Sequence, residues 1–297
     1  MLMLRFLKWT LLTLFGVYLA LCAALYLEQS KFIFVPQREV LHTPKEYGCD
    51  YQDVTFGGAE DQLHGWWLSA DPRLSPQMGS RTLIYFHGNG GSIGANAEHA
   101  CRLRNMGLNV FIFDYRGYGV RSDVQPTEQS VFADADSAWM YLTGKTTSDR
   151  SVDPHKVIIY GHSLGGAVAI ETAKRHPDAA ALIVESTFTS IRAMADLNSN
   201  FRFFPLSFIL NQKMDSLEKI KSIHMPILII HGTADDVVPS SMSQQLYYSA
   251  PGSKYLYLVK GAGHENCAAV AGQNYQKHVL DFLGSVPSPE ELRLSLQ

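Results

Sequence analysis

Cysteine is scarce in this chain of 297 residues, and its spacing does not fit metal binding. The four cysteines are Cys22, Cys49, Cys101 and Cys267, and no two of them form a C-x-x-C pair. Such scattered positions indicate neither a structural zinc site nor a disulfide framework, so we expect free thiols. The histidines also lack the H-E-x-x-H spacing of a zinc site, and we predict no metal and no other cofactor.

An excess of charge of one sign is absent as well. The formal net charge is −3 at pH 7 and no stretch is strongly basic, which argues against a nucleic-acid partner. We find no internal repeat and no low-complexity tract. Apolar residues make up 46% of the chain, enough for one large α/β domain with a substantial core.

Charge is missing altogether between Trp9 and Leu27, in the run WTLLTLFGVYLALCAALYL. As a helix rising ~1.5 Å per residue, this run spans roughly 28 Å, close to the hydrocarbon thickness of a bilayer. Aromatic rings lie near both ends of the run, where amphipathic side chains favour the membrane interface. We therefore predict a single transmembrane helix that anchors the protein through residues 1–28.

A cleaved signal peptide is the alternative, because the small residues of Cys22–Ala24 resemble a cleavage site. The apolar run exceeds the ~7–15 residues of a signal peptide, which favours a retained anchor. Arg5 and Lys8 lie close to the start of the run and favour a cytoplasmic N-terminus, with the large domain on the extracytoplasmic side. The positive residues after the run nearly balance them: Lys31, Arg38 and Lys45.

Eight apolar runs alternate with helical patterns in the rest of the chain. The runs predict strands over residues 50–56, 63–69, 81–87, 109–115, 156–161, 180–186, 225–232 and 254–261. Most of the later runs are continuously apolar, as expected when helices cover both faces of a sheet. The alternation predicts an α/β fold with a mostly parallel sheet flanked by helices. One of these helices is expected over 127–142, capped by Thr127.

This order predicts four consecutive segments: the anchor (1–28), a linker or edge segment (29–49), the α/β domain (50–284) and a tail (285–297). Residues 190–222 are inserted between two strands and contain the apolar stretch NFRFFPLSFIL. The insertion could form a short cap that gives the site an apolar slot, or it could simply pack on the sheet. Its length excludes a bulky lid domain.

A serine between two glycines follows the strand at 156–161. The segment Gly161-His162-Ser163-Leu164-Gly165 has the G-x-S-x-G pattern, with a strand before it and a helical pattern after it. This pattern describes a strained turn that holds the serine above the sheet, so we assign Ser163 as a nucleophile. The alternative is a tight turn whose serine only caps the helix. Serine at this position, rather than aspartate, disfavours dehalogenase chemistry.

A serine hydroxyl needs a base and a carboxylate that orients the base. At a turn of this type the acid and then the histidine follow the serine along the chain. His264, in the glycine-flanked loop KGAGHEN, is assigned as the base, whereas His231 precedes Asp235 and Asp236. Asp235 is the chosen acid; Asp236 and Glu185 remain open as alternatives.

Acyl transfer also needs hydrogen-bond donors for a developing oxyanion. We assign this role to the backbone N–H of Leu164, directly after the serine, and to that of Asn89 in the loop HGNGGS. This loop is glycine-rich but has neither phosphate-binding pattern, G-x-G-x-x-G or G-x-x-x-x-G-K-[ST].

Other polar residues near these loops receive structural assignments. Asp114 and Arg116 are expected to hold the turn DYRGYG as a charge pair, with substrate contact as the alternative. His87 and His162 are expected to pack beside the serine turn through hydrogen bonds.

Five segments, YFHGNGGS, DYRGYG, GHSLGG, HGTADDVVP and GAGH, occur in this order. Together they resemble the α/β-hydrolase superfamily, and specifically its Bem46-like branch, which is related to the ABHD13 and ABHD17 groups. An apolar segment followed by a sequence such as FIFVPQ also resembles that branch. The resemblance implies an α/β-hydrolase fold, Ser163, Asp235 and His264 as the triad, and Asn89 and Leu164 as the oxyanion hole.

Members of this branch are mostly esterase- or thioesterase-like, and some related groups remove acyl chains from proteins. The expected function is thus a membrane-anchored serine hydrolase that cleaves carboxylic esters or thioesters through an acyl-enzyme. Its substrate would be an acyl group on a lipid or an acylated protein, next to the bilayer. The alternatives are a catalytically silent binding or scaffold protein and a serine peptidase.

Overall fold

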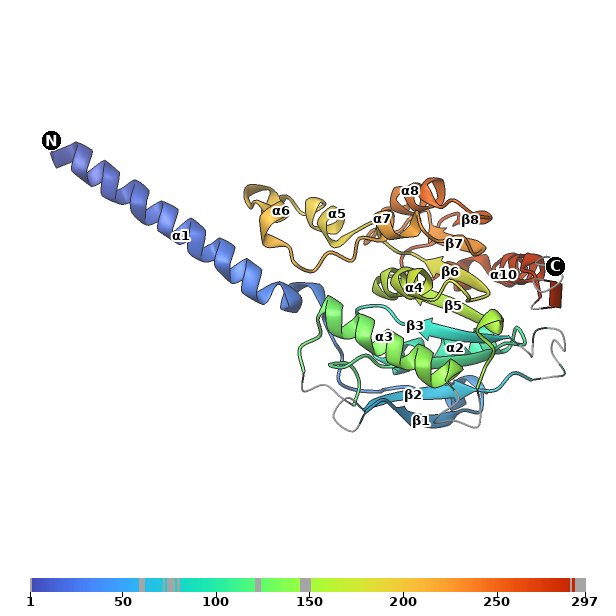
Figure 1. Ribbon diagram of the computed structural model, residues 1–297. Coiled ribbons are helices and arrows are strands. Elements are labelled where there is room, and N and C mark those ends of the chain that lie inside the picture. The colour runs from blue at the N-terminus through green and yellow to red at the C-terminus, as the bar shows by residue number, and fades with distance from the viewer. Residues whose placement is uncertain are drawn as a thin grey trace.

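One eight-stranded sheet forms the centre of the protein (Figure 1). The structure, a computed structural model, describes residues 2–58, 62–71, 73, 78, 81–120, 124–144, 151–288, 290 and 291. All eight predicted strands are present: β1 (Gln52–Phe56), β2 (Leu63–Leu68), β3 (Thr82–Phe86), β4 (Asn109–Phe113), β5 (Val157–His162), β6 (Ala181–Glu185), β7 (Ile227–Gly232) and β8 (Lys254–Val259). The prediction of an α/β-hydrolase fold with eight strands is therefore confirmed.

The sheet is parallel except at one edge. Its strand order is β1-β2-β4-β3-β5-β6-β7-β8, and only the β1–β2 and β2–β4 pairs are antiparallel. The parallel strands β3 and β5 lie side by side at the centre, with Tyr85 opposite Tyr160. Loops that follow β3, β5, β7 and β8 consequently meet at one edge of the sheet, where ligand sites form in such folds.

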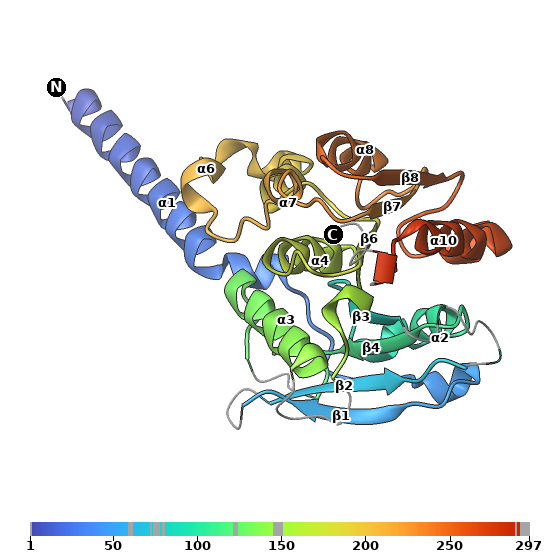
Figure 2. The same cartoon turned by 45° about the vertical axis from the view of Figure 1, so that its right-hand side comes forward.

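Helices cover both faces of this sheet (Figure 2). They are α2 (Ala97–Arg104), α3 (Glu128–Thr143), α4 (Leu164–Arg175), α7 (Ser216–Ile220), α8 (Ser240–Ser249), α9 (Cys267–Ala271) and α10 (Gln273–Ser285). α3, α4, α7 and α8 share one apolar cluster with the sheet, and α2, α9 and α10 share the other. The Thr127 side chain caps α3 by accepting a hydrogen bond from the N–H of Ser130, as predicted.

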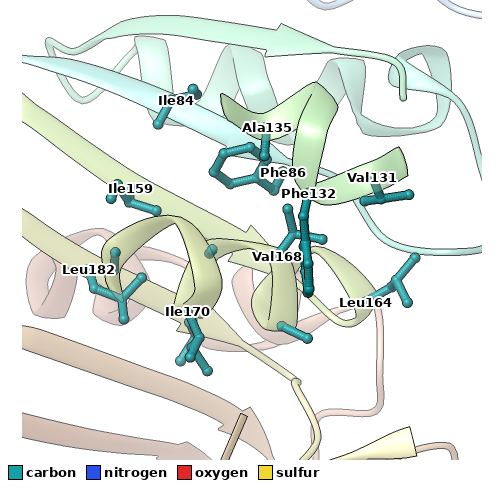
Figure 3. Close-up of a cluster of buried hydrophobic side chains, with 14 of the residues drawn as sticks. Ile84, Phe86, Val131, Phe132, Ala135, Ile159, Leu164, Val168, Ile170 and Leu182 are labelled. Carbon is teal, nitrogen blue, oxygen red and sulfur yellow. The ribbon is translucent and has the colours of Figure 1, made fainter. Parts of the chain in front are cut away.

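The core cluster on the α3–α4 face fixes the helix that follows the serine (Figure 3). Phe132 on α3 and Val168 on α4 pack with Phe86 of β3, and all three side chains are at most 6% exposed. Fully burying a large apolar side chain contributes ~1.5–3 kcal/mol relative to leaving it exposed. The start of α4 is thus held firmly against the sheet, and Ser163 with it.

The N-terminal apolar run forms one long helix, α1 (Leu2–Ile33), that projects from the domain (Figure 1). It is apolar and long enough to cross a membrane, and no residue of its most apolar window is buried in the domain. The helix continues five residues past the predicted anchor boundary at residue 28. Phe34, directly after it, is 1% exposed and belongs to the α3–α4 core cluster, so this one side chain of the segment FIFVP packs into the domain, whereas Phe32 and Val35 are exposed.

The insertion at 190–222 divides into two parts. The first holds α5 (Ile191–Asp196), the 3₁₀ helix η4 (Ser199–Phe203) and α6 (Leu206–Ile209); in both views α6 lies beside α1 (Figures 1 and 2). The second, α7, packs against α4. We use the name cap for residues 188–210, which include this first part.

The expectation of four free thiols is wrong. Cys49 and Cys101 form a disulfide, and only Cys22 and Cys267 are free. Cys49 follows the 3₁₀ helix η1 (Pro44–Tyr47), which packs against α2, where Cys101 lies. The two cysteines are 52 residues apart in sequence, so only the packing of η1 on α2 brings them together.

The expected charge pair between Asp114 and Arg116 is also wrong. The Arg116 guanidinium pairs with Asp134 on α3, with an Nε–Oδ1 distance of 2.6 Å. Asp114 instead accepts a hydrogen bond from the N–H of Ile93 and lies 3.6 Å from His87 Nε2. The predicted tail at 285–297 falls largely outside the described residues.

Candidate active site

The turn between β5 and α4 has the strained shape that its sequence predicts. Ser163 has φ 53° and ψ −118°, an unfavourable backbone conformation for a residue other than glycine. A Cβ on Gly161 would lie 2.1 Å from the carbonyl oxygen of Gly165, and one on Gly165 would lie 2.0 Å from that of Phe86. Glycine is therefore required at both positions for the helix, the turn and β3 to approach so closely.

Three side chains form a hydrogen-bonded chain at the edge of the sheet. His264 Nε2 lies 2.8 Å from Ser163 Oγ, and His264 Nδ1 lies 2.8 Å from Asp235 Oδ2. Ser163 follows β5, Asp235 follows β7 and His264 follows β8. The structure thus brings together the three side chains that the sequence nominated, in the geometry of a serine, a base and an orienting acid.

The carboxylate of Asp235 has other partners in addition to His264. Its Oδ1 accepts hydrogen bonds from the N–H groups of Val237 and Val238 at 2.9 and 2.8 Å. The fully buried His231 places Nε2 3.1 Å from Asp235 Oδ2 and Nδ1 2.6 Å from the Ser243 hydroxyl. Sequence order places His231 before Asp235 and so excludes it as the base, but no local pattern in the sequence indicates that it supports the acid.

These contacts set the charges of the pair. Burial alone would raise the pKa of Asp235, but hydrogen bonds from His231 and His264 outweigh burial and hold that pKa below its usual range. Burial alone would likewise lower the pKa of His264, whereas the hydrogen bond and charge of Asp235 raise it above the ordinary value. A carboxylate that stabilises an adjacent imidazolium is the arrangement that general-base catalysis by histidine needs.

The alternative acids lie elsewhere. Asp236 is exposed, and its side chain makes no described hydrogen bond to His264. The Glu185 carboxylate accepts hydrogen bonds from the buried hydroxyls of Tyr160 and Tyr275 at 3.0 and 2.6 Å. His162 Nε2 lies 3.0 Å from the carbonyl oxygen of His264 and so supports the histidine loop.

Asn89 and Leu164, the two predicted oxyanion donors, line the same cavity as Ser163. Leu164 is the first residue of α4, so its N–H has no acceptor one turn earlier in the helix. The Asn89 side chain is tied to the end of α1: its Nδ2 donates to the Ile33 carbonyl oxygen at 2.7 Å, and its Oδ1 accepts from the N–H of Val35 at 2.8 Å. The position of the loop after β3 therefore depends on the segment that leaves α1.

A cavity of about 710 Å³ opens above Ser163. This volume lies within the ~300–1,000 Å³ of small-molecule sites. Apart from His264 and Glu265, no described residue that lines it is ionisable. Most of the lining side chains are apolar and come from α1, the cap and the loop after β7: Leu25, Phe32, Ile33, Val35, Phe188, Ile191, Met194, Ala195, Phe201, Leu206, Ile209, Leu210, Val237 and Val238.

His162, His264 and Glu265 are close enough to be considered as metal ligands, with ligand atoms within 4.8 Å of one another. However, both ring nitrogens of His264 already have partners, Asp235 and Ser163. A metal ion at this place would have to break the chain that aligns the serine. The donor set therefore fits the hydrogen-bonded chain better than a metal.

Comparison with known proteins identifies relatives that extend over most of the chain. The sequence profile of the serine aminopeptidase S33 family matches residues 79–210 and 206–268. The uncharacterized protein Rv2307c of Mycobacterium tuberculosis is 36% identical over 261 residues, covering 85% of this chain and 89% of that protein. Protein bem46 of Schizosaccharomyces pombe is 30% identical over 290 residues, covering 93% of each chain. The α/β-hydrolase domain-containing protein WAV2 of Arabidopsis thaliana is 30% identical over 291 residues, covering 90% of this chain and 91% of its own.

Solved structures share the fold. The esterase Pf2001 of Pyrococcus furiosus superposes with a TM-score of 0.65 at 22% sequence identity, covering 84% of this chain and 98% of that one. Identity this low shows the fold alone, whereas the profile and the three relatives extend over most of the chain. The chain therefore belongs to the serine aminopeptidase S33 family of the α/β hydrolases, with bem46 and WAV2 among its relatives.

Proposed function

We propose that the protein is a membrane-anchored serine hydrolase that cleaves carboxylic ester or thioester bonds. The observation that carries this proposal is the hydrogen-bonded chain from Ser163 through His264 to Asp235 at the base of an apolar cavity. A silent scaffold would not need this chain, nor the strained backbone at Ser163.

The reaction follows from the positions of these atoms. His264 Nε2 takes the proton of Ser163 Oγ while that oxygen bonds to the acyl carbon of the substrate. The N–H groups of Asn89 and Leu164 hold the negative charge on the carbonyl oxygen. The intermediate collapses to an acyl-serine, and His264 gives its proton to the leaving alcohol or thiol. Water then attacks the acyl-serine with His264 again as the base, which releases the acid and restores the serine.

The lining of the cavity favours an acyl group over a peptide. An aminopeptidase must bind the charged amino end of its substrate, and the described lining offers only Glu265 as a carboxylate, with a side chain 77% exposed. The apolar lining instead fits an alkyl chain. We therefore place the peptidase alternative second.

The test is Ser163→Ala. We expect this variant to lose the hydrolysis of p-nitrophenyl esters by up to roughly 10⁶-fold in kcat, together with labelling by a fluorophosphonate. Its thermal denaturation should match the wild type, because the change removes one hydroxyl. Hydrolysis at the wild-type rate by the folded variant would remove Ser163 from the mechanism.

We further propose that α1 is a retained membrane anchor. α1 runs without a break through Cys22–Ala24, and Tyr18, which precedes that segment, contacts the cap. The Cys49–Cys101 disulfide favours an oxidising compartment for the domain, which agrees with Arg5 and Lys8 on the cytoplasmic side. In isolated membranes, Cys49 and Cys101 should react with an alkylating reagent only after reduction. Alkylation without reduction would contradict this topology.

A further inference from the structure

The wall of the active-site cavity includes the membrane helix itself. Leu25, Gln29, Phe32 and Ile33 of α1 line the same cavity as Ser163. Met194, Phe201, Leu206 and Ile209 of the cap also line it. A helix that served only as a tether would have no reason to form part of the site.

Polar contacts fix α1 against the end of the cap. Gln29 is only 5% exposed, although it has a polar side chain and lies on a helix that is otherwise largely exposed. Its Oε1 accepts hydrogen bonds from the N–H groups of Asn211 and Gln212 at 2.9 and 3.1 Å, and its Nε2 donates to the Ile209 carbonyl oxygen at 3.2 Å. One amide thus satisfies three backbone groups at the point where α1 meets the cap.

A second contact lies eleven residues earlier, inside the apolar run. The Tyr18 hydroxyl donates to the Phe203 carbonyl oxygen at 2.9 Å, and the Tyr18 ring stacks on Phe204 at 6.0 Å. Buried or partly covered residues of α1 recur at helical spacing on one face: Tyr18, Cys22, Leu25, Gln29 and Ile33, with the partly covered Ser30 beside Gln29. We use the name seam for the contact between this stripe and the cap residues that it touches, which include Phe203, Phe204 and Ile209.

The depth of the seam places it in lipid if α1 spans a bilayer. Tyr18 is nine residues before Leu27, the last residue of the apolar run, and at ~1.5 Å per residue this is about 14 Å along the helix. A hydrocarbon layer about 30 Å thick therefore surrounds the cap residues that touch Tyr18. The cap also leaves Phe203 and Phe208 66% and 87% exposed, which is unfavourable in water and favourable in hydrocarbon.

From this arrangement we propose that the acyl chain of an ester within the bilayer reaches Ser163 sideways, along the seam between α1 and the cap. The occupant is a long alkyl chain, because the seam leads into an apolar cavity whose two described ionisable groups, His264 and Glu265, are near the serine. α1 then serves as the acyl-binding wall in addition to its role as an anchor. This inference rests on the proposed function, since it takes Ser163 as the acylated residue.

The direct test uses a long-chain alkyl fluorophosphonate with a diazirine at the end of its chain, added to full-length protein in liposomes. After the probe reacts, light and peptide mass spectrometry locate both ends of it. We expect phosphonylation of Ser163 and diazirine adducts on residues 18–35 and 188–210. Phosphonylated Ser163 with adducts only outside these two segments would overturn the seam proposal alone. Absence of phosphonylation at Ser163 would overturn the proposed function, and the seam proposal with it.

A matched pair of variants tests the wall by kinetics. Leu25→Trp adds bulk inside the seam, whereas Leu27→Trp adds the same bulk on the opposite face of α1, where Leu27 is 75% exposed. In proteoliposomes, Leu25→Trp should lower the ratio of p-nitrophenyl palmitate to p-nitrophenyl butyrate hydrolysis at least tenfold, and Leu27→Trp should leave this ratio as in the wild type. Equal ratios in the two variants would contradict the proposal.

Discussion

Asp235 and Asp236 are adjacent in sequence, but their carboxylates have different surroundings. The Asp235 side chain is fully buried and receives hydrogen bonds from His264, Val237 and Val238, whereas Asp236 is exposed. Sequence order could narrow the acid to this loop, because both residues follow a strand and precede His264. Sequence order alone could not show which of the two carboxylates contacts His264, because the loop conformation decides which one points inward.

Substitution separates them by kinetics. Asp235→Asn should lower kcat by about 10⁴-fold, because an amide no longer holds the imidazole in the tautomer that accepts the serine proton. Asp236→Asn, the matched control, should change kcat less than tenfold. Both rates are to be measured on p-nitrophenyl butyrate at equal thermal stability. A larger loss in Asp236→Asn would mean that the acid is assigned to the wrong residue.

The ionisation of His264 determines how kcat/KM depends on pH. His264 must be neutral to take the proton of Ser163, and its pKa is raised above the ordinary value of about 6.5 because Asp235 stabilises the imidazolium more than burial disfavours it. We therefore expect kcat/KM to rise with pH through a single ionisation above that value.

The nearby carboxylate of Glu265 contributes to the raised pKa of His264. Glu265→Gln removes this negative charge, which destabilises the imidazolium, so the acid limb of the profile should move to lower pH. Glu218→Gln, on the distant helix α7, serves as the control and should leave the limb in place. A shift toward higher pH in Glu265→Gln would contradict this electrostatic account.

At the scale of elements, the strands were predictable and the contacts between distant segments were not. The runs at 157–160 and 227–230 are continuously apolar, and they lie in β5 and β7, which are buried along their whole length. The disulfide and the seam depend instead on packing between segments far apart in sequence: η1 on α2, and α1 on α6. No local pattern marks Gln29 as the residue that joins α1 to the end of the cap.

The joint between α1 and the cap gives a prediction at this scale. Gln29→Ala leaves the N–H groups of Asn211 and Gln212, which are only partly buried, without their acceptor, at a cost of about 0.5–1.5 kcal/mol for each lost hydrogen bond. Hydrogen exchange at these two amides should become faster, while exchange in β5 stays unchanged. Lys31→Ala, at an exposed position on the same helix, is the control.

Unchanged exchange at both amides in Gln29→Ala would show that the side chain does not fasten the cap. Faster exchange across β5 as well would instead indicate general destabilisation of the domain. In either case the polar joint would no longer support a fixed seam.

On the scale of the whole molecule, one edge of the sheet collects the chemistry of the chain. Ser163, Asp235 and His264 are 101 residues apart at their extremes, yet they meet because parallel strands end at the same edge. This part of the site could be predicted, since the motifs that follow β5, β7 and β8 are local in sequence. The cavity could not, because its walls combine the N-terminal helix with an insertion more than 150 residues later.

The central claim is that Ser163 carries the acyl group during turnover, and acid quenching tests it most directly. Full-length protein in liposomes is mixed with p-nitrophenyl palmitate, quenched in acid within the first turnovers and digested for peptide mass spectrometry. We expect a palmitoyl mass on Ser163 that is absent from Ser163→Ala and that disappears as the substrate is consumed. Ester hydrolysis with the acyl mass on another residue, such as Cys267, and never on Ser163 would contradict it.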